Sequence, residues 1–286
     1  MKSTNRRLWL IYQQADVKKN QWYIEEYIRI GKELGLKVEL ILIEELIFGV
    51  KNNTWFVGQK GKLEEPPEFA IIRTIYPLLS RHLEQMGVRV FNSSKVSEIC
   101  NDKARTYQYI AKLQIPMIDT MFVKNSMVTQ YRSEYQAQYV IKAVDGHGGG
   151  QVFCVEEKED FPVFERVGYS DTVFQPLIGT KHQDLRVYVL GKRILAGILR
   201  TAKEGFKSNF SLGGTVHTYS LSEQETALVQ KIIDQFEFGL VGIDFLIGES
   251  GELIFNEIED VVGARMLYQC TKIDLVREYL TFLISS

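Results

Sequence analysis

Acidic side chains interrupt two apolar segments late in the sequence. Asp244 stands inside VGIDFLI (241–247), while Glu257 and Glu259 stand inside ELIFNEIE (252–259). A lone carboxylate in an apolar strand is costly to bury unless it is paired, and the intervening GESG is typical of a hairpin turn. Carboxylate oxygens are also the ligands that Mg²⁺ prefers. The pattern predicts a hairpin that binds one or two magnesium ions, which can in turn hold nucleotide phosphates.

The register of this hairpin decides whether the carboxylates meet. With GESG as the turn, Ile247 is expected opposite Glu252, and Asp244 opposite Phe255. Asp244 and Glu257 then become diagonal neighbours about 7–8 Å apart on one face. A slip of one residue would send Asp244 to the opposite face. A solvated acidic surface without a metal is the alternative.

A second candidate site is the glycine-rich segment QYVIKAVDGHGGGQVFCV (138–155). The residues after its glycines are β-branched and aromatic, so a strand follows where phosphate-binding loops of the common types continue into a helix. A glycine-rich β-hairpin can instead fold over a nucleotide and donate backbone N–H groups to phosphates, within reach of Lys142. A hairpin of the same kind without a ligand is the alternative. The glycines concerned are Gly146, Gly148, Gly149 and Gly150.

Two arginines stand in another predicted hairpin, DLRVYVL-GK-RILAGILR. The planar guanidinium groups of Arg186 and Arg200 are suited to binding carboxylate or phosphate in a bidentate manner. A two-residue loop at Gly191-Lys192 would put these arginines on opposite faces. A three-residue loop that includes Arg193 would put them on the same face, and the sequence leaves both open.

The segment AKEGFKSNFSLGG (202–214) carries two further polar candidates, Lys203 and Asn209. We expect it to order over a substrate and exclude water, although its composition also suits a solvated surface loop. Arg73 ends a predicted strand much earlier in the chain. It either reaches a substrate cleft or caps the edge of the sheet.

The elements that must position these residues alternate between strand and helix in the first hundred residues. A helix is predicted over 22–34, and strands are predicted over 8–12, 38–43, 69–73 and 88–91. This alternation favours a mostly parallel sheet. Helices are predicted to begin after Asn92-Ser93-Ser94 and at Asp102, and Ser222 with Glu225 forms a capping box for another.

Composition narrows the class of protein. The chain has 286 residues, a length typical of about two domains, and a net charge of -2, which argues against non-specific nucleic-acid binding. No apolar run reaches the ~18 residues that a membrane helix needs. Cys100, Cys154 and Cys270 are far apart and odd in number, which favours neither disulfides nor a zinc site. We therefore expect a soluble cytoplasmic protein.

Together these motifs resemble the ATP-grasp enzymes, and among them the RimK-like carboxylate–amine ligases. The resemblance covers about residues 69 to 265. Its motifs, in the family's order, are NDKART (101–106), VIKAVDGHGGG (140–150), FQPLIG (174–179), DLR (184–186), RTAKEGFKSNFSLGG (200–214), GIDFL (242–246) and NEIE (256–259).

The resemblance implies an α/β (α+β) fold, with a small parallel-sheet pre-ATP-grasp domain at 1–97 and an ATP-grasp domain at 98–286. The latter divides into a lid subdomain (98–178) and a magnesium and substrate subdomain (179–286). The implied nucleotide-binding residues, beyond the glycines above, are Lys103 and Lys142 for phosphates, Gln175, Pro176, Leu177 and Ile178 for adenine, and Asp184 for ribose. The implied metal ligands are Asp244, Glu257 and Glu259, and the implied catalytic residues are Arg186, Arg200, Lys203 and Asn209.

The implied reaction is an ATP-dependent, ADP-forming ligation of a carboxylate to an amine through an acyl phosphate, with ATP and Mg²⁺ (or Mn²⁺) as cofactors. The expected substrates are an amino acid or small carboxylate, with glutamate foremost, and an amine acceptor, and a homo-oligomer is compatible with the family. One residue departs from the pattern, because Glu259 stands where the RimK-like sequences carry Asn. Alternatives are another biosynthetic ATP-grasp amino-acid ligase or a catalytically silent ATP-binding module.

Overall fold

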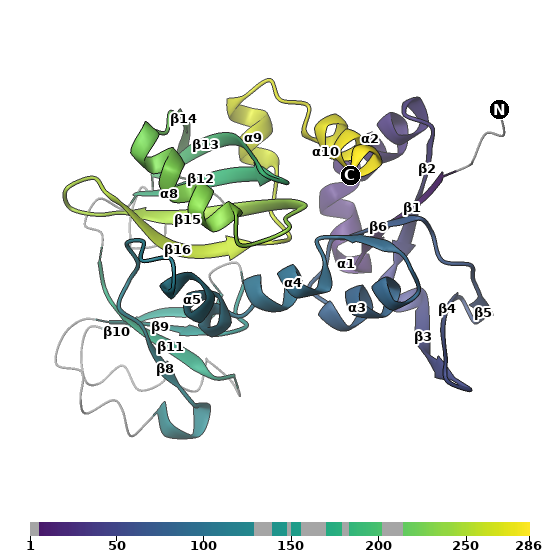
Figure 1. Ribbon diagram of the computed structural model, residues 1–286, viewed down its shortest axis with the longest axis horizontal. Helices are drawn as coiled ribbons and strands as arrows, with labels where there is room; N and C mark the ends of the chain where they lie inside the picture. The colour runs from purple at the N-terminus through teal and green to yellow at the C-terminus, as the bar shows by residue number, and fades with distance from the viewer. Residues whose placement is uncertain (1–5, 129–138, 148–149, 156–169, 179–182, 202–213) are drawn as a thin grey trace.

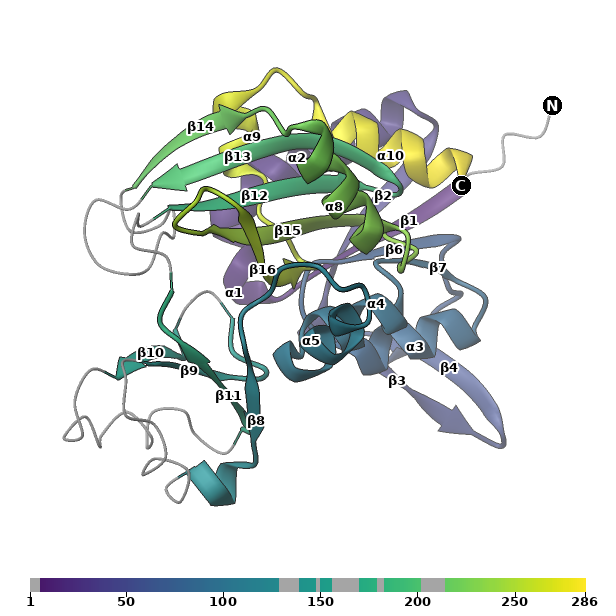
Figure 2. The same ribbon diagram turned by 60° about the vertical axis from the view of Figure 1, so that its left-hand side comes forward.

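A computed structural model describes residues 6–128, 139–147, 150–155, 170–178, 183–201 and 214–286 (Figures 1 and 2). The described chain is a mixed α/β structure with four sheets, in agreement with the predicted fold class. None of its helices is long and apolar enough to cross a membrane.

The first sheet is parallel, as the alternation of strands and helices predicted. Its order is β2-β1-β6-β7, and every neighbouring pair runs in the same direction. Its strands are β1 (Arg6–Tyr12), β2 (Leu36–Leu42), β6 (Phe69–Ile72) and β7 (Arg89–Phe91), and its helices include α1 (Gln14–Val17), η1 (Lys18–Asn20), α2 (Gln21–Glu33) and α3 (Pro77–Gln85). Helix α2 ends just before Gly35, which adopts a left-handed φ of 76° that favours glycine.

A small antiparallel sheet, β3-β4-β5, follows the short helix η2 (Ile43–Glu45) and projects from this part of the molecule (Figure 1). Its strands are β3 (Leu46–Lys51), β4 (Thr54–Gln59) and β5 (Lys62–Leu63). The sequence reading assigned no strand between residues 44 and 65. A signal was present in the pair Asn52-Asn53, because asparagine tolerates the positive φ that a tight hairpin turn requires, and both residues adopt it.

The glycine-rich segment lies in a third sheet of order β10-β9-β11-β8. Its strands are β8 (Met121–Val123), β9 (Tyr139–Ala143), β10 (Val152–Val155) and β11 (Thr172–Pro176), and the helix η3 (Asn125–Met127) follows β8. Strands β9 and β10 pair antiparallel on either side of the glycines, so the predicted strand–loop–strand hairpin is confirmed.

The largest sheet carries both remaining hairpins and has the order β14-β13-β12-β15-β16. Its strands are β12 (Gln183–Leu190), β13 (Arg193–Thr201), β14 (Thr215–Tyr219), β15 (Leu240–Ile247) and β16 (Leu253–Glu259). Helices α4 (Ser94–Cys100), α5 (Lys103–Ala111) and α8 (Glu223–Ile233) cover it through a shared apolar core. The capping box of Ser222 and Glu225 forms as predicted.

The end of the chain returns to the first sheet. After α9 (Arg265–Cys270), helix α10 (Leu275–Ser285) lies beside α2 (Figure 1). Leu275, Tyr279 and Leu280 of α10 share one apolar core with Leu8 and Leu10 of β1. The domain boundaries drawn from the sequence remain predictions, and this core joins residues from both sides of them.

We predict that Leu280→Ala lowers the free energy of unfolding by about 2–5 kcal/mol, because it opens a cavity where the side chain is fully buried. Urea denaturation would measure the change. The exposed neighbour Thr281 provides the control variant Thr281→Ala, for which we expect a change within about 0.5 kcal/mol. Equal effects of the two substitutions would contradict the packing described here.

Candidate functional site

The acidic hairpin forms, but with a different register from the predicted one. Ile247 lies opposite Leu253, and Phe245 lies opposite Phe255. The expected pairs of Ile247 with Glu252 and of Asp244 with Phe255 are therefore wrong. A β-bulge follows, in which one extra residue, Asn256, is inserted into β16.

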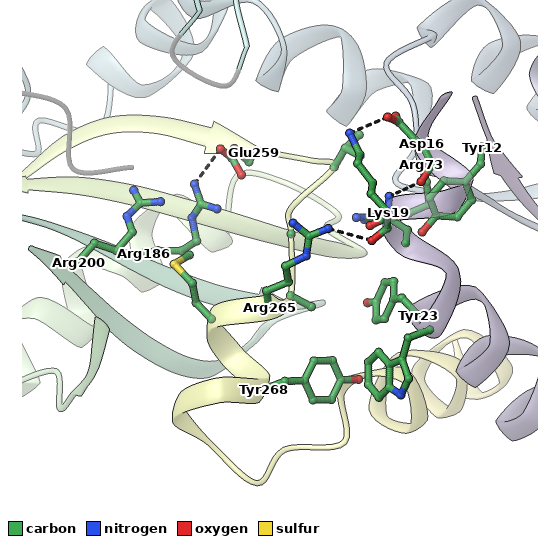
Figure 3. A pocket seen from close by; sticks show the side chains of 16 residues that line it. Tyr12, Asp16, Lys19, Tyr23, Arg73, Arg186, Arg200, Glu259, Arg265 and Tyr268 are labelled. Carbon is green, nitrogen blue, oxygen red and sulfur yellow. Dashed lines mark hydrogen bonds and ion pairs between the residues drawn. The ribbon is translucent and has the colours of Figure 1, made fainter. Parts of the chain in front are cut away.

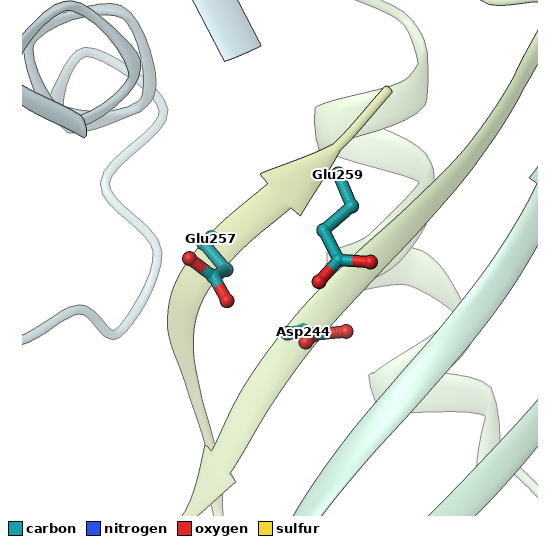
Figure 4. Close-up of side chains that lie close together, drawn as sticks. All are labelled: Asp244, Glu257 and Glu259. Atoms are coloured by element: carbon teal, nitrogen blue, oxygen red, sulfur yellow. The ribbon is translucent and has the colours of Figure 1, made fainter. Parts of the chain in front are cut away.

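This bulge restores the alignment that the register alone would have lost. Beyond it, Asp244 lies directly opposite Glu257, and Gly242 lies opposite Glu259. The ligand oxygens of Asp244, Glu257 and Glu259 all lie within 4.8 Å of one another (Figure 4). Three carboxylates that converge in this way form an all-oxygen donor set, which fits Mg²⁺.

A second β-bulge, between β12 and β13, determines on which face of the sheet Arg186 and Arg200 lie. The loop between β12 and β13 has two residues, since Leu190 pairs with Arg193, and this alone would separate Arg186 from Arg200. The register shifts after Tyr188, where an extra residue in β13 reverses the alternation. Both arginines consequently lie on the same face of the sheet.

Both arginines bind the same buried carboxylate. Arg186 donates to Asp244 through Nε and Nη2, each at 2.7 Å, and Arg200 donates through Nη2 at 2.7 Å. Arg186 Nη2 also lies 2.8 Å from Glu259 Oε1, while Arg200 Nε donates to Asp184. The exposed fractions are 1% for Asp244, 6% for Arg186 and 4% for Arg200. The result is a buried charge network with Asp244 at its centre.

The charge network shifts the pKa values of Asp244 and Asp184 in opposite directions. Burial would raise the pKa of Asp244, but the guanidinium groups of Arg186 and Arg200 outweigh it and hold this pKa at about 2. Burial raises the pKa of Asp184 to about 6, even though Arg200 opposes the shift. Asp244 therefore keeps its negative charge over the whole physiological pH range.

The two lysines predicted to bind phosphate lie around Glu257. Lys103 Nζ is 3.7 Å from Glu257 Oε2 and donates to the carbonyl oxygen of Gly146 in the glycine-rich hairpin. Lys142 Nζ donates to Asn256 Oδ1 at 2.9 Å. Burial lowers the pKa of Lys142 to about 8, helped by the nearby charge of Lys103 and opposed by Glu257.

The remaining predicted site residues lie outside the cluster of three carboxylates or outside the described residues. Asp184, expected to bind ribose, is buried and held by Arg200, so that role remains a prediction. Gln175 is buried in β11 and donates to Thr120, and Pro176 ends the strand just before Leu177 and Ile178. Gly150 lies in a turn two residues before β10. Gly148, Gly149, Lys203 and Asn209 lie outside the described residues.

A cavity of about 770 Å³ reaches this network from the side of the first sheet (Figure 3). Arg186, Arg200 and Glu259 line one end of it. Arg73 lies in its wall and donates to the carbonyl oxygen of Val262 at 2.9 Å, so this arginine reaches the cleft. The lining residues that sequence reasoning missed include Tyr12, Asp16, Lys19, Tyr23, Arg265 and Tyr268.

Topology offered a signal for some of these missed residues. Tyr12 ends β1 and Arg73 directly follows β6, which are adjacent parallel strands. Ligands of open parallel sheets bind beyond the carboxyl ends of the strands. The residues after β1 were therefore candidates, although their position against Glu259 depends on the tertiary fold.

A family model, curated relatives and solved structures all relate this chain to ATP-grasp ligases. Residues 100–283 match the model of the RimK-like ATP-grasp domain. An uncharacterised protein of Mycoplasma genitalium, MG011, is 24% identical over 100% of this chain and 95% of its own length. Human beta-citrylglutamate synthase B is 25% identical over 89% of this chain and 71% of its own length. The solved structure of the ATP-grasp ligase PsnB with Mg, ADP and a phosphomimetic precursor superposes with a TM-score of 0.71 at 16% identity, over 98% of each chain.

We predict that Asp244→Asn lowers the free energy of unfolding by about 3–5 kcal/mol in metal-free buffer, because it leaves two buried guanidinium groups without their shared carboxylate. Urea denaturation monitored by circular dichroism would measure the change. Asp119→Asn removes an exposed carboxylate and serves as the control. A loss below about 1 kcal/mol for Asp244→Asn would contradict the central role of this carboxylate.

We predict that binding of MgADP takes up protons near pH 8. An ammonium with a pKa of about 8 is half protonated there, and a phosphate beside Lys142 would raise this pKa toward its ordinary value. The uptake should be about half a proton at pH 8 and below about 0.2 at pH 7.

Titration calorimetry in buffers of different ionisation enthalpy would measure this uptake. Lys142→Arg is the matched variant, because its guanidinium stays charged at both pH values. Uptake that is the same in Lys142→Arg would assign the proton to another group.

Proposed function

Because this chain belongs to the RimK-like ATP-grasp family, we propose that it joins glutamate or another amino acid to a small molecule or peptide. The chain is an ATP-grasp ligase that forms carbon–nitrogen bonds and uses ATP. The identity of the carboxylate and of the amine is the part that we propose here. A cytoplasmic location remains a prediction from composition.

The observation that carries the proposal is the continuity of one cavity with the charged centre. Arg186, Arg200 and Glu259 line the cavity and also belong to the network around Asp244. A carboxylate in the cavity would therefore lie beside the groups that would hold the γ-phosphate of ATP. Such proximity is the main requirement for transfer between two anions.

The chemistry proceeds in two steps. A carboxylate oxygen of the first substrate attacks the γ-phosphorus, the bond to the β,γ-bridging oxygen breaks, and ADP leaves with an acyl phosphate formed. The amine of the second substrate then attacks the acyl carbon and loses a proton, while inorganic phosphate leaves. ATP is needed because a free carboxylate is a poor electrophile toward an amine.

Different basic residues would stabilise the negative charges of the nucleotide and of the substrate. Lys103 and Lys142 are placed to hold phosphate oxygens close to Glu257. Arg186 and Arg200 already use Nε and Nη2 in the network, and Nη1 of each makes no hydrogen bond within the described chain. These Nη1 groups can donate to a carboxylate or to the acyl phosphate without breaking the bonds to Asp244.

Asp244, Glu257 and Glu259 would hold Mg²⁺, which when bound neutralises phosphate charge. Glu259 adds a negative charge where the RimK-like pattern has a neutral Asn. In this structure that charge is partly met by Arg186, at 2.8 Å. Since Arg186 binds both Asp244 and Glu259, a divalent cation would use the oxygen lone pairs that the guanidinium groups leave free.

Glutamate is favoured as a substrate by the relatives. One of them is named for the synthesis of beta-citrylglutamate, and another is described as a probable alpha-L-glutamate ligase of Legionella pneumophila. Both names describe those proteins, and they make glutamate the first compound to test with this one.

We predict that Lys142→Ala and Glu257→Ala each abolish ADP release from MgATP while the protein stays folded. The measurement offers the purified protein pools of amino acids and carboxylates and follows the products by mass spectrometry. Glu249→Ala, at the exposed turn of the same hairpin, removes a carboxylate far from the cluster and should retain activity.

The outcomes separate the functions. Release that requires glutamate and one carboxylate, with a product of the summed mass minus water, would support glutamate ligation. Release with a different amino acid would favour another ATP-grasp amino-acid ligase. Tight ATP binding without release from any pool, including a peptide library, would contradict the proposed activity.

A further inference from the structure

We propose that Arg73 and Tyr12 form a recognition site for a second, non-reacting anionic group on the substrate that fills the cavity. This inference rests on the proposed function, since it concerns the substrate of the same reaction. It assigns the compound a chemical class: an acid with two anionic groups, one at the network of Arg186 and Arg200 and one at Arg73.

Arg73 is a cation without a counter-charge in the described part of the chain. It forms no ion pair there, its Nη2 donates to the carbonyl oxygen of Val262, and its guanidinium carbon lies 5.9 Å from the centre of the Tyr23 ring. Its Nε is buried and has no hydrogen-bond partner. Asp260 is near enough to be influenced by this charge, but it forms no ion pair with Arg73. Arg73 as a whole is partly exposed, but a buried guanidinium nitrogen without a partner is costly, and a bound anion would offset that cost.

Tyr12, which lies next to Arg73, also points to a ligand. It is 1% exposed, it lines the same cavity, and its hydroxyl has no hydrogen-bond partner. Buried hydroxyl groups are otherwise nearly always paired. Both unpaired groups can donate, and the guanidinium can only donate. Two converging donors fit a carboxylate or a phosphate, and they do not fit an ammonium group.

The position of Arg73 relative to the reaction centre follows from one loop. Arg73 binds the carbonyl oxygen of Val262, and the side chains of Val262 and Arg186 both lie beside Gly242. A Cβ atom at Gly242 would lie 2.7 Å from Val262 Cγ2 and 3.2 Å from Arg186 Cδ. Figure 3 shows Arg73 and Arg186 at separate places in the wall of this cavity. Both arginines line the same cavity.

Lys19 and Arg265 also line the cavity, but both are exposed, whereas Arg73 is only partly exposed. Lys19 lies 2.6 Å from Asp16, and its side chain is 61% exposed. Arg265 donates to the carbonyl oxygen of Lys19 at 2.9 Å. Neither shows the combination of burial and missing partners found at Arg73, so we place the anion there.

The test compares matched probes on the protein saturated with MgADP. Glutarate and valerate share a five-carbon chain and differ by one carboxylate, and 4-phosphonobutyrate replaces that carboxylate by a phosphonate. Titration calorimetry would give the dissociation constants. Wild-type protein should bind glutarate at least about tenfold more tightly than valerate, as expected for one charge-assisted hydrogen-bonded contact.

The variants assign the preference to residues. Arg73→Gln should reduce it to below about threefold, and Tyr12→Phe should reduce it in part. Arg265→Gln removes the same charge from the same cavity and should leave the preference intact. MgADP binding measured in each variant shows that the site remains folded, and Tyr12→Phe keeps the test decisive if Arg73→Gln does not fold.

Each outcome decides the matter. Tighter binding of 4-phosphonobutyrate, lost in Arg73→Gln, would identify a phosphate as the second group and support the proposal. Equal binding of glutarate and valerate, no binding of any probe, or a preference that survives Arg73→Gln would overturn it. Failure of wild-type protein to bind MgADP would instead contradict the proposed function, and the inference with it.

Discussion

One carboxylate, that of Asp244, organises the centre of this molecule. It accepts three hydrogen bonds from Arg186 and Arg200, and these residues come from three adjacent strands, β15, β12 and β13. Breaking a buried pair of this kind is far more costly than never forming it. The sheet is therefore held in the arrangement that places both guanidinium groups at the end of the cavity.

The charges around this centre balance in the free protein. Four basic side chains and four carboxylates meet here. The basic residues are Arg186, Arg200, Lys103 and Lys142, and the acidic residues are Asp184, Asp244, Glu257 and Glu259. Nucleotide and metal would enter as partners of opposite charge, so the balance can persist in the loaded state. Arg73 lies outside this balanced group, which is the reason that it stands out as a site for a further anion.

The strands, turns and helix caps around the site could be predicted from the sequence more accurately than the register between paired strands. Both hairpins, the helix caps, the parallel first sheet and the convergence of three carboxylates follow from patterns of alternation, capping and charge. The alignment within each hairpin depends on one inserted residue, and a bulge has no reliable signature in a single sequence. The predicted register was off by one residue at Ile247, and the extra residue Asn256 made it off by two at Asp244, which returned Asp244 and Glu257 to the same face. The lining of the cavity could not be predicted, because Tyr12, Arg73 and Glu259 approach one another only through tertiary packing.

The packing of α10 on the first sheet has a consequence for biosynthesis. Leu8 and Leu10 of β1 are fully buried in a core that needs Leu275, Tyr279 and Leu280 of α10 for its completion. Domains usually fold as they emerge from the ribosome, the amino-terminal part first. Here the first sheet has its full apolar cover only after residues 275–285 have been synthesised. Until then, Leu8 and Leu10 can be covered by residues of α2 such as Tyr27 and Ile30, but they lack the part of their apolar cover that α10 supplies.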